Sequence, residues 1–118
     1  MKYEGKADLR QRALKFAIEV IMFVNTLAKN DTNRILVNQL IRSATSIGAN
    51  LEEARGSRTR AEFTNSTNIA KKEARETFYW LKIISEVNPK SPKLEGLLKE
   101  SDELIAILTS SVKKLTEK

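Results

Sequence analysis

The sequence contains no cysteine and no histidine, and only four glycines and two prolines. Without cysteine there is no disulfide or thiolate chemistry, which is compatible with the cytoplasm. Without histidine, the Ser-His-Asp and Cys-His catalytic arrangements and the Glu-x-x-His sites of di-iron bundles are absent. A structural zinc site is strongly disfavoured because both of its usual ligand types are missing. We therefore predict no enzymatic activity, no catalytic residues, no metal and no cofactor.

Long apolar runs are also missing. No stretch approaches the ~20 apolar residues that a membrane-spanning helix needs. The first twelve residues, MKYEGKADLRQR, are polar and lack the apolar centre of a signal peptide. We therefore expect a cytoplasmic protein that does not enter a membrane.

The residues that are present favour helices. Leu, Ile, Ala, Lys and Glu are abundant, and 118 residues suit one domain. Apolar residues recur every three or four positions, which is the helical period. The pattern predicts an all-α, antiparallel up-down-up-down four-helix bundle over residues 1–118, with helices at about 7–28, 32–55, 59–87 and 92–116.

Local signals mark the helix ends. Thr59 and Glu62 have capping-box spacing, and Ser91 followed by Pro92 reads as a cap and a first helical position. Gly56 is expected to end the second helix in the left-handed conformation. Gly48, in the middle of that helix, costs about 1 kcal/mol relative to alanine, so we expect it to allow another helix to approach closely.

Two groups of apolar residues lie beside the main apolar stripes of their helices. The first helix carries a main stripe and a second one beside it, formed by Leu14, Ile18 and Ile21. So wide a surface calls for more than one neighbouring helix. On the third helix an apolar patch lies off the main stripe, and we predict that it is an interface between subunits; its members are Ile69, Trp80 and Ile83.

Basic residues gather from position 55 to position 82, where seven Lys or Arg stand against three Glu. Basic residues spaced along a helix can bind successive phosphates. We identify six as candidate nucleic-acid ligands: Arg55, Arg58, Arg60, Lys71, Lys72 and Arg75.

Simpler interpretations of this region stay open. The basic residues can form a solubilising surface with ion pairs inside the helix, such as Lys72 with Glu76. Glu73 and Glu76 share a helix face, and a solvated face is a better explanation for them than a metal or acid–base pair. Tyr79 and Trp80 can stack on unpaired bases, although such aromatic residues are more often packing groups.

Two segments also indicate a family. RSATSIGANLEEARGSRTRAEF (42–63) and IAKKEARETFYWL (69–81) resemble the four-helix-bundle proteins encoded within intervening sequences of bacterial 23S ribosomal RNA genes. The most specific pieces are RSATSIGAN (42–50) and YWL (79–81). The same fold class includes the accessory variability protein of diversity-generating retroelements. The resemblance covers nearly the whole chain.

The resemblance implies a ring of bundles, a pentamer, that binds RNA or DNA through a basic surface, with no catalytic residue to carry over. Together with the net charge of +6, it predicts a homo-oligomer that binds nucleic acid through backbone phosphates. An alternative is a protein-interaction adaptor whose basic face docks an acidic partner or a reverse transcriptase. No small-molecule substrate is expected.

Overall fold

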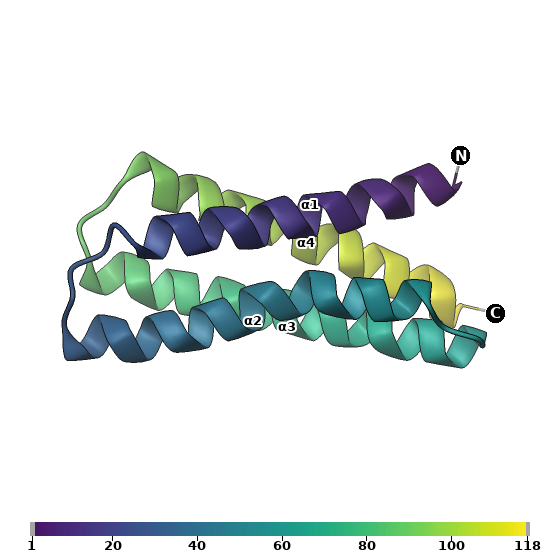
Figure 1. The fold of residues 1–118 in the computed structure, drawn as a ribbon. Helices are drawn as coiled ribbons and strands as arrows, with labels where there is room; N and C mark the ends of the chain where they lie inside the picture. The colour runs from purple at the N-terminus through teal and green to yellow at the C-terminus, as the bar shows by residue number, and fades with distance from the viewer. Residues whose placement is uncertain (1, 118) are drawn as a thin grey trace.

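The computed structural model describes residues 2–117, and the side chains of residues 9–117. This part of the chain forms four helices and no strand: α1 (Lys2–Val24), α2 (Asp31–Arg55), α3 (Arg60–Val87) and α4 (Pro92–Thr116). The helices alternate in direction along a rod of 47 × 22 × 21 Å, and both ends of the chain lie at the same end of it (Figure 1). The all-α, antiparallel four-helix bundle predicted from the sequence is therefore confirmed.

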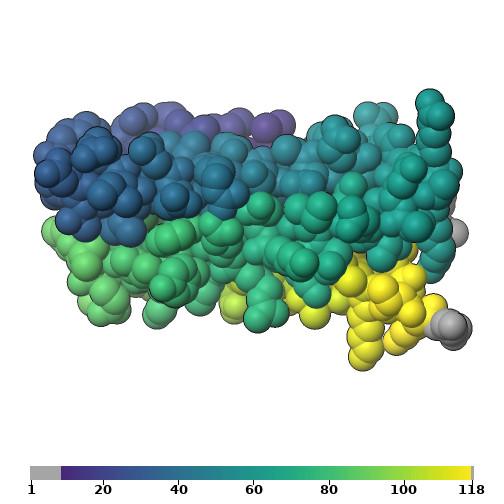
Figure 2. Space-filling view, turned by 90° about the horizontal axis from the view of Figure 1, so that it is seen from below, coloured from purple at the N-terminus to yellow at the C-terminus, as the bar shows by residue number. Residues whose placement is uncertain are grey.

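Each helix of the bundle packs against two others. α2 packs against α1 and α3, and α4 packs against α3 and α1. α1 and α3 consequently lie on opposite corners of the rod. In Figure 2, α2 and α3 run side by side across one face of the molecule. The outer side of α3 is therefore open to solvent along the length of the rod.

Side-chain caps begin three of the helices. The side-chain oxygens of Asn30, Thr59 and Ser91 each accept a hydrogen bond from the backbone N–H three residues later. Each cap satisfies an amide that the helix itself leaves without a partner. Pro92 follows Ser91 in the first turn of α4, where its missing N–H costs nothing. The caps therefore fix the starts of α2, α3 and α4 at positions that the sequence marks.

Two local expectations need correction. α1 ends at Val24 instead of Ala28, because the N–H groups of Thr26 and Leu27 turn back to the carbonyls three residues earlier. Leu27 still packs against the core from this turn. Gly56 has φ of −88°, so it is not left-handed; its N–H closes the last turn of α2 on the Glu53 carbonyl.

The core is aliphatic along most of the rod. Each helix contributes fully buried side chains; the largest are Phe16, Val20, Leu40, Ile47, Leu81, Ile84, Leu94, Leu97, Leu104 and Leu108. Two buried hydroxyls meet inside it, since Thr77 donates to Ser43 at 2.9 Å. Among residues 9–117 no buried side-chain polar atom lacks a hydrogen-bond partner. The four helices thus close a continuous core without an unpaired polar group in the described part.

Small residues bring α1 and α2 together. A Cβ placed on Gly48 of α2 would lie 3.5 Å from the Cβ of Ala13 on α1 and 3.8 Å from the Ala13 carbonyl carbon. These are ordinary contact distances, so the two helices approach closely enough to leave room for a methyl group but little more. Toward α4, Arg12 of α1 donates to Glu100 at 2.8 and 2.9 Å and to Glu103 at 2.6 Å. These hydrogen bonds connect α1 to α4 and raise the pKa of Arg12 above its ordinary value.

Candidate nucleic-acid interface

Arg42 on α2 binds two carboxylates of α3. Its guanidinium donates to Glu73 at 3.3 and 3.4 Å and to Glu76. The indole N–H of Trp80 donates to the same Glu76 carboxylate at 2.9 Å. The Trp80 hydrogen bond, followed by that of Arg42, lowers the pKa of Glu76, and the bond to Glu76 raises the pKa of Arg42. Glu73 and Glu76 are therefore held toward α2.

The third acid of this region is also occupied. Glu62 sits in the first turn of α3, where its carboxylate accepts the backbone N–H of Arg58 at 2.9 Å. Its own N–H is capped by Thr59 at 3.0 Å. All three glutamates between positions 55 and 82 thus bind groups other than the lysines of α3. The ion pair between Lys72 and Glu76 that the simpler interpretation suggests is not formed, because Glu76 faces Arg42 and Trp80.

The outer side of α3 carries cations without acidic partners. Lys72, Arg75 and Lys82 are exposed, and none forms an ion pair within residues 9–117. Spacings of three and seven residues place side chains on the same side of a bundle helix. Asn68, Arg75 and Lys82 form one such row, and Lys72 and Tyr79 lie in the row beside it. This surface is defined by these five residues and is called here the α3 basic row; Asn68 is half-buried and the other four are exposed.

The candidate ligands form two groups. Arg55 ends α2, Arg58 lies in the turn and Arg60 begins α3, so these three arginines gather at one end of the rod. The guanidinium of Arg60 donates to the carbonyl of Leu115 on α4 at 3.1 Å, which uses part of its donor capacity for the fold. Lys72 lies about 18 Å further along α3, at 1.5 Å per residue. The six predicted ligands therefore do not form one cluster. Three of them, called here the arginine turn, lie at the connection between α2 and α3, and the other three lie further along α3.

Lys71 differs from its neighbour in the sequence. It is half-buried, whereas Lys72 is exposed. Lys82, in contrast, lies in the α3 basic row, although it is not among the six candidate ligands predicted from the sequence. The seven-residue spacing from Arg75 to Lys82 is the signal that identifies it.

The predicted interface patch on α3 is more enclosed than the sequence suggests. Ile69, Trp80 and Ile83 are all half-buried within a single bundle, and Trp80 and Ile83 pack against the core. Although Trp80 lies off the main apolar stripe, its indole N–H donates to Glu76 at the seam between α2 and α3. Trp80 and Ile83 therefore already have a packing role within one chain.

The exposed apolar surface lies instead on α1. Leu14 and Met22 are 61% and 63% exposed, and Ile18 and Ile21 are also open to solvent. Their spacing of four, three and one residues places them on one side of α1. This surface, called here the α1 apolar stripe, includes the second stripe that the sequence places on the first helix. No other helix of the described chain covers it.

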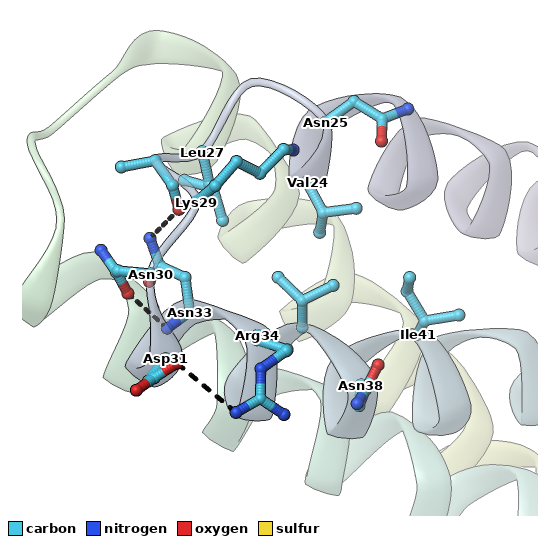
Figure 3. Close-up of a pocket in the computed structure, with 12 residues that line it drawn as sticks. Val24, Asn25, Leu27, Lys29, Asn30, Asp31, Asn33, Arg34, Asn38 and Ile41 are labelled. Carbon is cyan, nitrogen blue, oxygen red and sulfur yellow. Dashed lines mark hydrogen bonds and ion pairs between the residues drawn. The ribbon is translucent and has the colours of Figure 1, made fainter.

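A hollow between the end of α1 and the start of α2 is shown in Figure 3. Aliphatic and amide side chains line most of it. Asn33 stabilises its loop by donating to the carbonyl of Ala28 at 2.8 Å and to Asn88 at 3.0 Å. On its rim, Asp31 and Arg34 pair with each other at 3.5 Å. The polar groups of this hollow thus serve the loop and the helix start.

Among the residues whose side chains the structure describes, no group of three or more His, Cys, Asp or Glu is arranged to hold a metal ion. No described helix combines the length and apolar character that crossing a membrane would require.

Comparison with known proteins identifies a family and a related crystal structure. The sequence pattern of the 23S rRNA-intervening sequence protein family matches residues 5–110. A crystal structure from Bacteroides thetaiotaomicron, described as a protein with unknown function from the S23 ribosomal protein family, is similar at a TM-score of 0.82 and 33% identity. The match covers 92% of this chain and 97% of that one. A comparison with curated proteins finds no match. The chain, through its sequence and its four-helix fold, belongs to the 23S rRNA-intervening sequence protein family.

Proposed function

We propose that this protein is a non-enzymatic homo-oligomer of the cytoplasm that binds RNA or DNA through backbone phosphates. The proposal rests on which charged side chains of α3 have partners and which do not. Glu62, Glu73 and Glu76 are bound by the start of α3, Arg42 and Trp80, and Glu86, near the C-terminal end of α3, is an exposed acid. Lys72, Arg75 and Lys82 form no ion pair within residues 9–117. A row of solvated cations attracts a polyanion, and its counterions are released on binding.

The contacts in this proposal are mainly to phosphate. Arginine can bind a phosphate with two parallel hydrogen bonds, and lysine binds it as a point charge. The arginine turn and the α3 basic row together provide sites along about 30 Å of α3, from Arg60 to Lys82. Because the family is described by its connection to 23S rRNA, structured RNA is the first ligand to test.

Assembly into an oligomer, a pentamer as the resemblance implies, is the second part of the proposal. Two apolar surfaces are available for contacts between copies: the seam with Ile69, Trp80 and Ile83, and the α1 apolar stripe. We favour the stripe, because its side chains are more exposed and lack a packing role in the single chain. The stripe lies on the corner opposite α3, so assembly through it would leave the α3 basic row accessible.

A fluorescence anisotropy titration tests the nucleic-acid proposal. Labelled structured RNA and duplex DNA are titrated with the protein at several salt concentrations. The proposal predicts binding that weakens steeply with salt, with a slope in log K against log salt of about −0.7 to −0.9 for each phosphate contacted. Binding absent at low salt, or unchanged across the salt series, contradicts it.

Light scattering tests the assembly. The proposal predicts a mass that is a multiple of the 13.4 kDa chain. A monomer mass at high protein concentration contradicts it.

An adaptor that docks an acidic protein or a reverse transcriptase is the second candidate, because the same unpaired cations complement an acidic protein surface. Pull-down from a lysate treated with nuclease separates the two. An adaptor retains its protein partner after nuclease treatment, whereas a nucleic-acid-binding protein loses everything held through RNA or DNA.

A further inference from the structure

Tyr79 is exposed in the middle of the α3 basic row. Its side chain is 59% exposed, and it follows Arg75 by four residues and precedes Lys82 by three. These spacings place both cations within one helical turn of the ring. The other described aromatic side chains, those of Phe16, Phe23, Phe63, Phe78 and Trp80, are buried or half-buried. An exposed aromatic residue among cations thus distinguishes this surface from the aliphatic stripe on α1.

The ring of Tyr79 is supported from one side. It contacts the indole of Trp80 at a centroid distance of 5.3 Å and an interplanar angle of 67°. Trp80 is itself fixed by its hydrogen bond to Glu76, which Arg42 holds from α2. The hydroxyl of Tyr79 forms no hydrogen bond within residues 9–117. The fold therefore orients the ring while leaving most of it in solvent, where it contributes little to the core.

We infer that Tyr79 is a stacking platform for an unpaired base, and that the α3 basic row binds single-stranded or looped nucleic acid in preference to a duplex. The inference rests on the proposed function and adds the class of ligand to it. Bases inside a duplex already stack on each other and offer no free face to a side chain on the surface. An unpaired base can stack on an aromatic ring while flanking cations bind the phosphates on either side. Arg75 and Lys82 stand on either side of Tyr79 along the helix, as this arrangement requires.

The test compares one strand with its own duplex. A labelled oligoribonucleotide of about 15 residues without internal pairing is titrated with the full-length protein, and then again after annealing to its complement. The inference predicts that the single strand binds ~10-fold more tightly than the duplex at the same salt concentration. Ultraviolet irradiation of the single-strand complex should crosslink the RNA to the peptide that contains Tyr79.

Three variants separate stacking from other effects. Tyr79→Ala should weaken single-strand binding ~10-fold and leave duplex binding within ~2-fold, since stacking on one ring is worth a factor of this size. Tyr79→Phe keeps the ring and should retain wild-type binding. Tyr79→Leu keeps an apolar side chain without an aromatic face and should behave like the alanine variant. Circular dichroism confirms that each variant is folded, which is expected for an exposed position.

The outcomes distinguish this inference from the proposed function. If duplex and single strand bind equally and Tyr79→Ala has no effect, whereas loss of Arg75 and Lys82 weakens both, the stacking inference is wrong and phosphate binding stands. If neither form binds at low salt, both proposals fail. If the leucine variant retains full single-strand binding, the side chain acts through apolar contact and the assignment of stacking is wrong.

Discussion

Replacing Gly48 with alanine is expected to stabilise the bundle. Gly48 lies in the interior of α2 and faces Ala13 of α1. A Cβ at position 48 would meet the Ala13 Cβ at 3.5 Å and no other heavy atom closer than 3.8 Å, so it would make normal contacts without a clash. Alanine loses less backbone entropy than glycine on forming a helix, and this difference favours the folded alanine variant by about 1 kcal/mol.

The size of the effect can be compared with a larger side chain. For a chain of this length, 1 kcal/mol of unfolding free energy corresponds to a rise in melting temperature of about 4 °C. Gly48→Val adds a Cβ and two further methyl groups to a site with room for about one carbon, and overpacking costs about 1–3 kcal/mol. Valine is also restricted in a helix by its branched Cβ. We therefore expect the order of stability Ala, Gly, Val at position 48.

Thermal unfolding followed by circular dichroism measures this order, and Gly96 provides the control. A Cβ on Gly96 of α4 would have no heavy atom within 4 Å, so Gly96→Ala isolates the helix-propensity term. The alanine variants at positions 48 and 96 should stabilise by similar amounts, and valine should be tolerated at position 96 only. If Gly48→Ala lowers the melting temperature, α1 and α2 lie closer than described here and the reasoning fails.

Three further expectations concern the seam and the stripe. Glu76→Gln should destabilise the protein at neutral pH by no more than about 1 kcal/mol, because the ion pair is partly exposed. The pairing lowers the folded pKa of Glu76 below its unfolded value, so the stabilisation is complete above the unfolded pKa and is lost as pH falls through the folded pKa; the difference in denaturant midpoint from wild type should shrink over this acid range, and a difference that persists below it contradicts the pairing. Trp80→Phe should lower the free energy of unfolding in urea by about 1–2 kcal/mol, because the hydrogen bond to a carboxylate is lost, and it should not change the oligomer mass. A change in mass would show that Trp80 takes part in contacts between copies. The double variant Leu14→Gln/Ile18→Gln should shift the mass in light scattering toward 13.4 kDa, whereas Ile35→Gln, at an equally exposed site on α2, should not. The same mass for the double variant and the Ile35 control contradicts a role for the α1 apolar stripe.

The sequence predicts the fold well because local signals and the apolar period agree. Ser91 and Pro92 start α4, and the leucines of α4 form one stripe that is buried on one side. The end of α1 was harder to place. Leu27 continues the apolar pattern but packs from a turn, so burial does not reveal where the helical hydrogen bonds stop.

The candidate site was predicted only in part, because pairing across helices is not visible in one sequence. Along α3 the natural partner of Glu76 is Lys72, one turn away, but the structure gives it Arg42 from a segment 34 residues earlier. That long-range contact is what leaves Lys72 without an acid. Trp80 meets the same carboxylate and is half-buried, whereas Tyr79, its neighbour in the sequence, points about 100° away around the helix and is exposed.

The central claim is that the unpaired cations of α3 bind phosphate, and the salt dependence of RNA affinity in two matched double variants tests it most directly. Lys72→Gln with Arg75→Gln removes two charges from the α3 basic row, and Lys15→Gln with Lys99→Gln removes two exposed charges from α1 and α4. The account predicts that the first pair flattens the slope of log K against log salt by about 1.4 to 1.8, and that the second pair leaves it nearly unchanged. Equal slopes for the two double variants would contradict it.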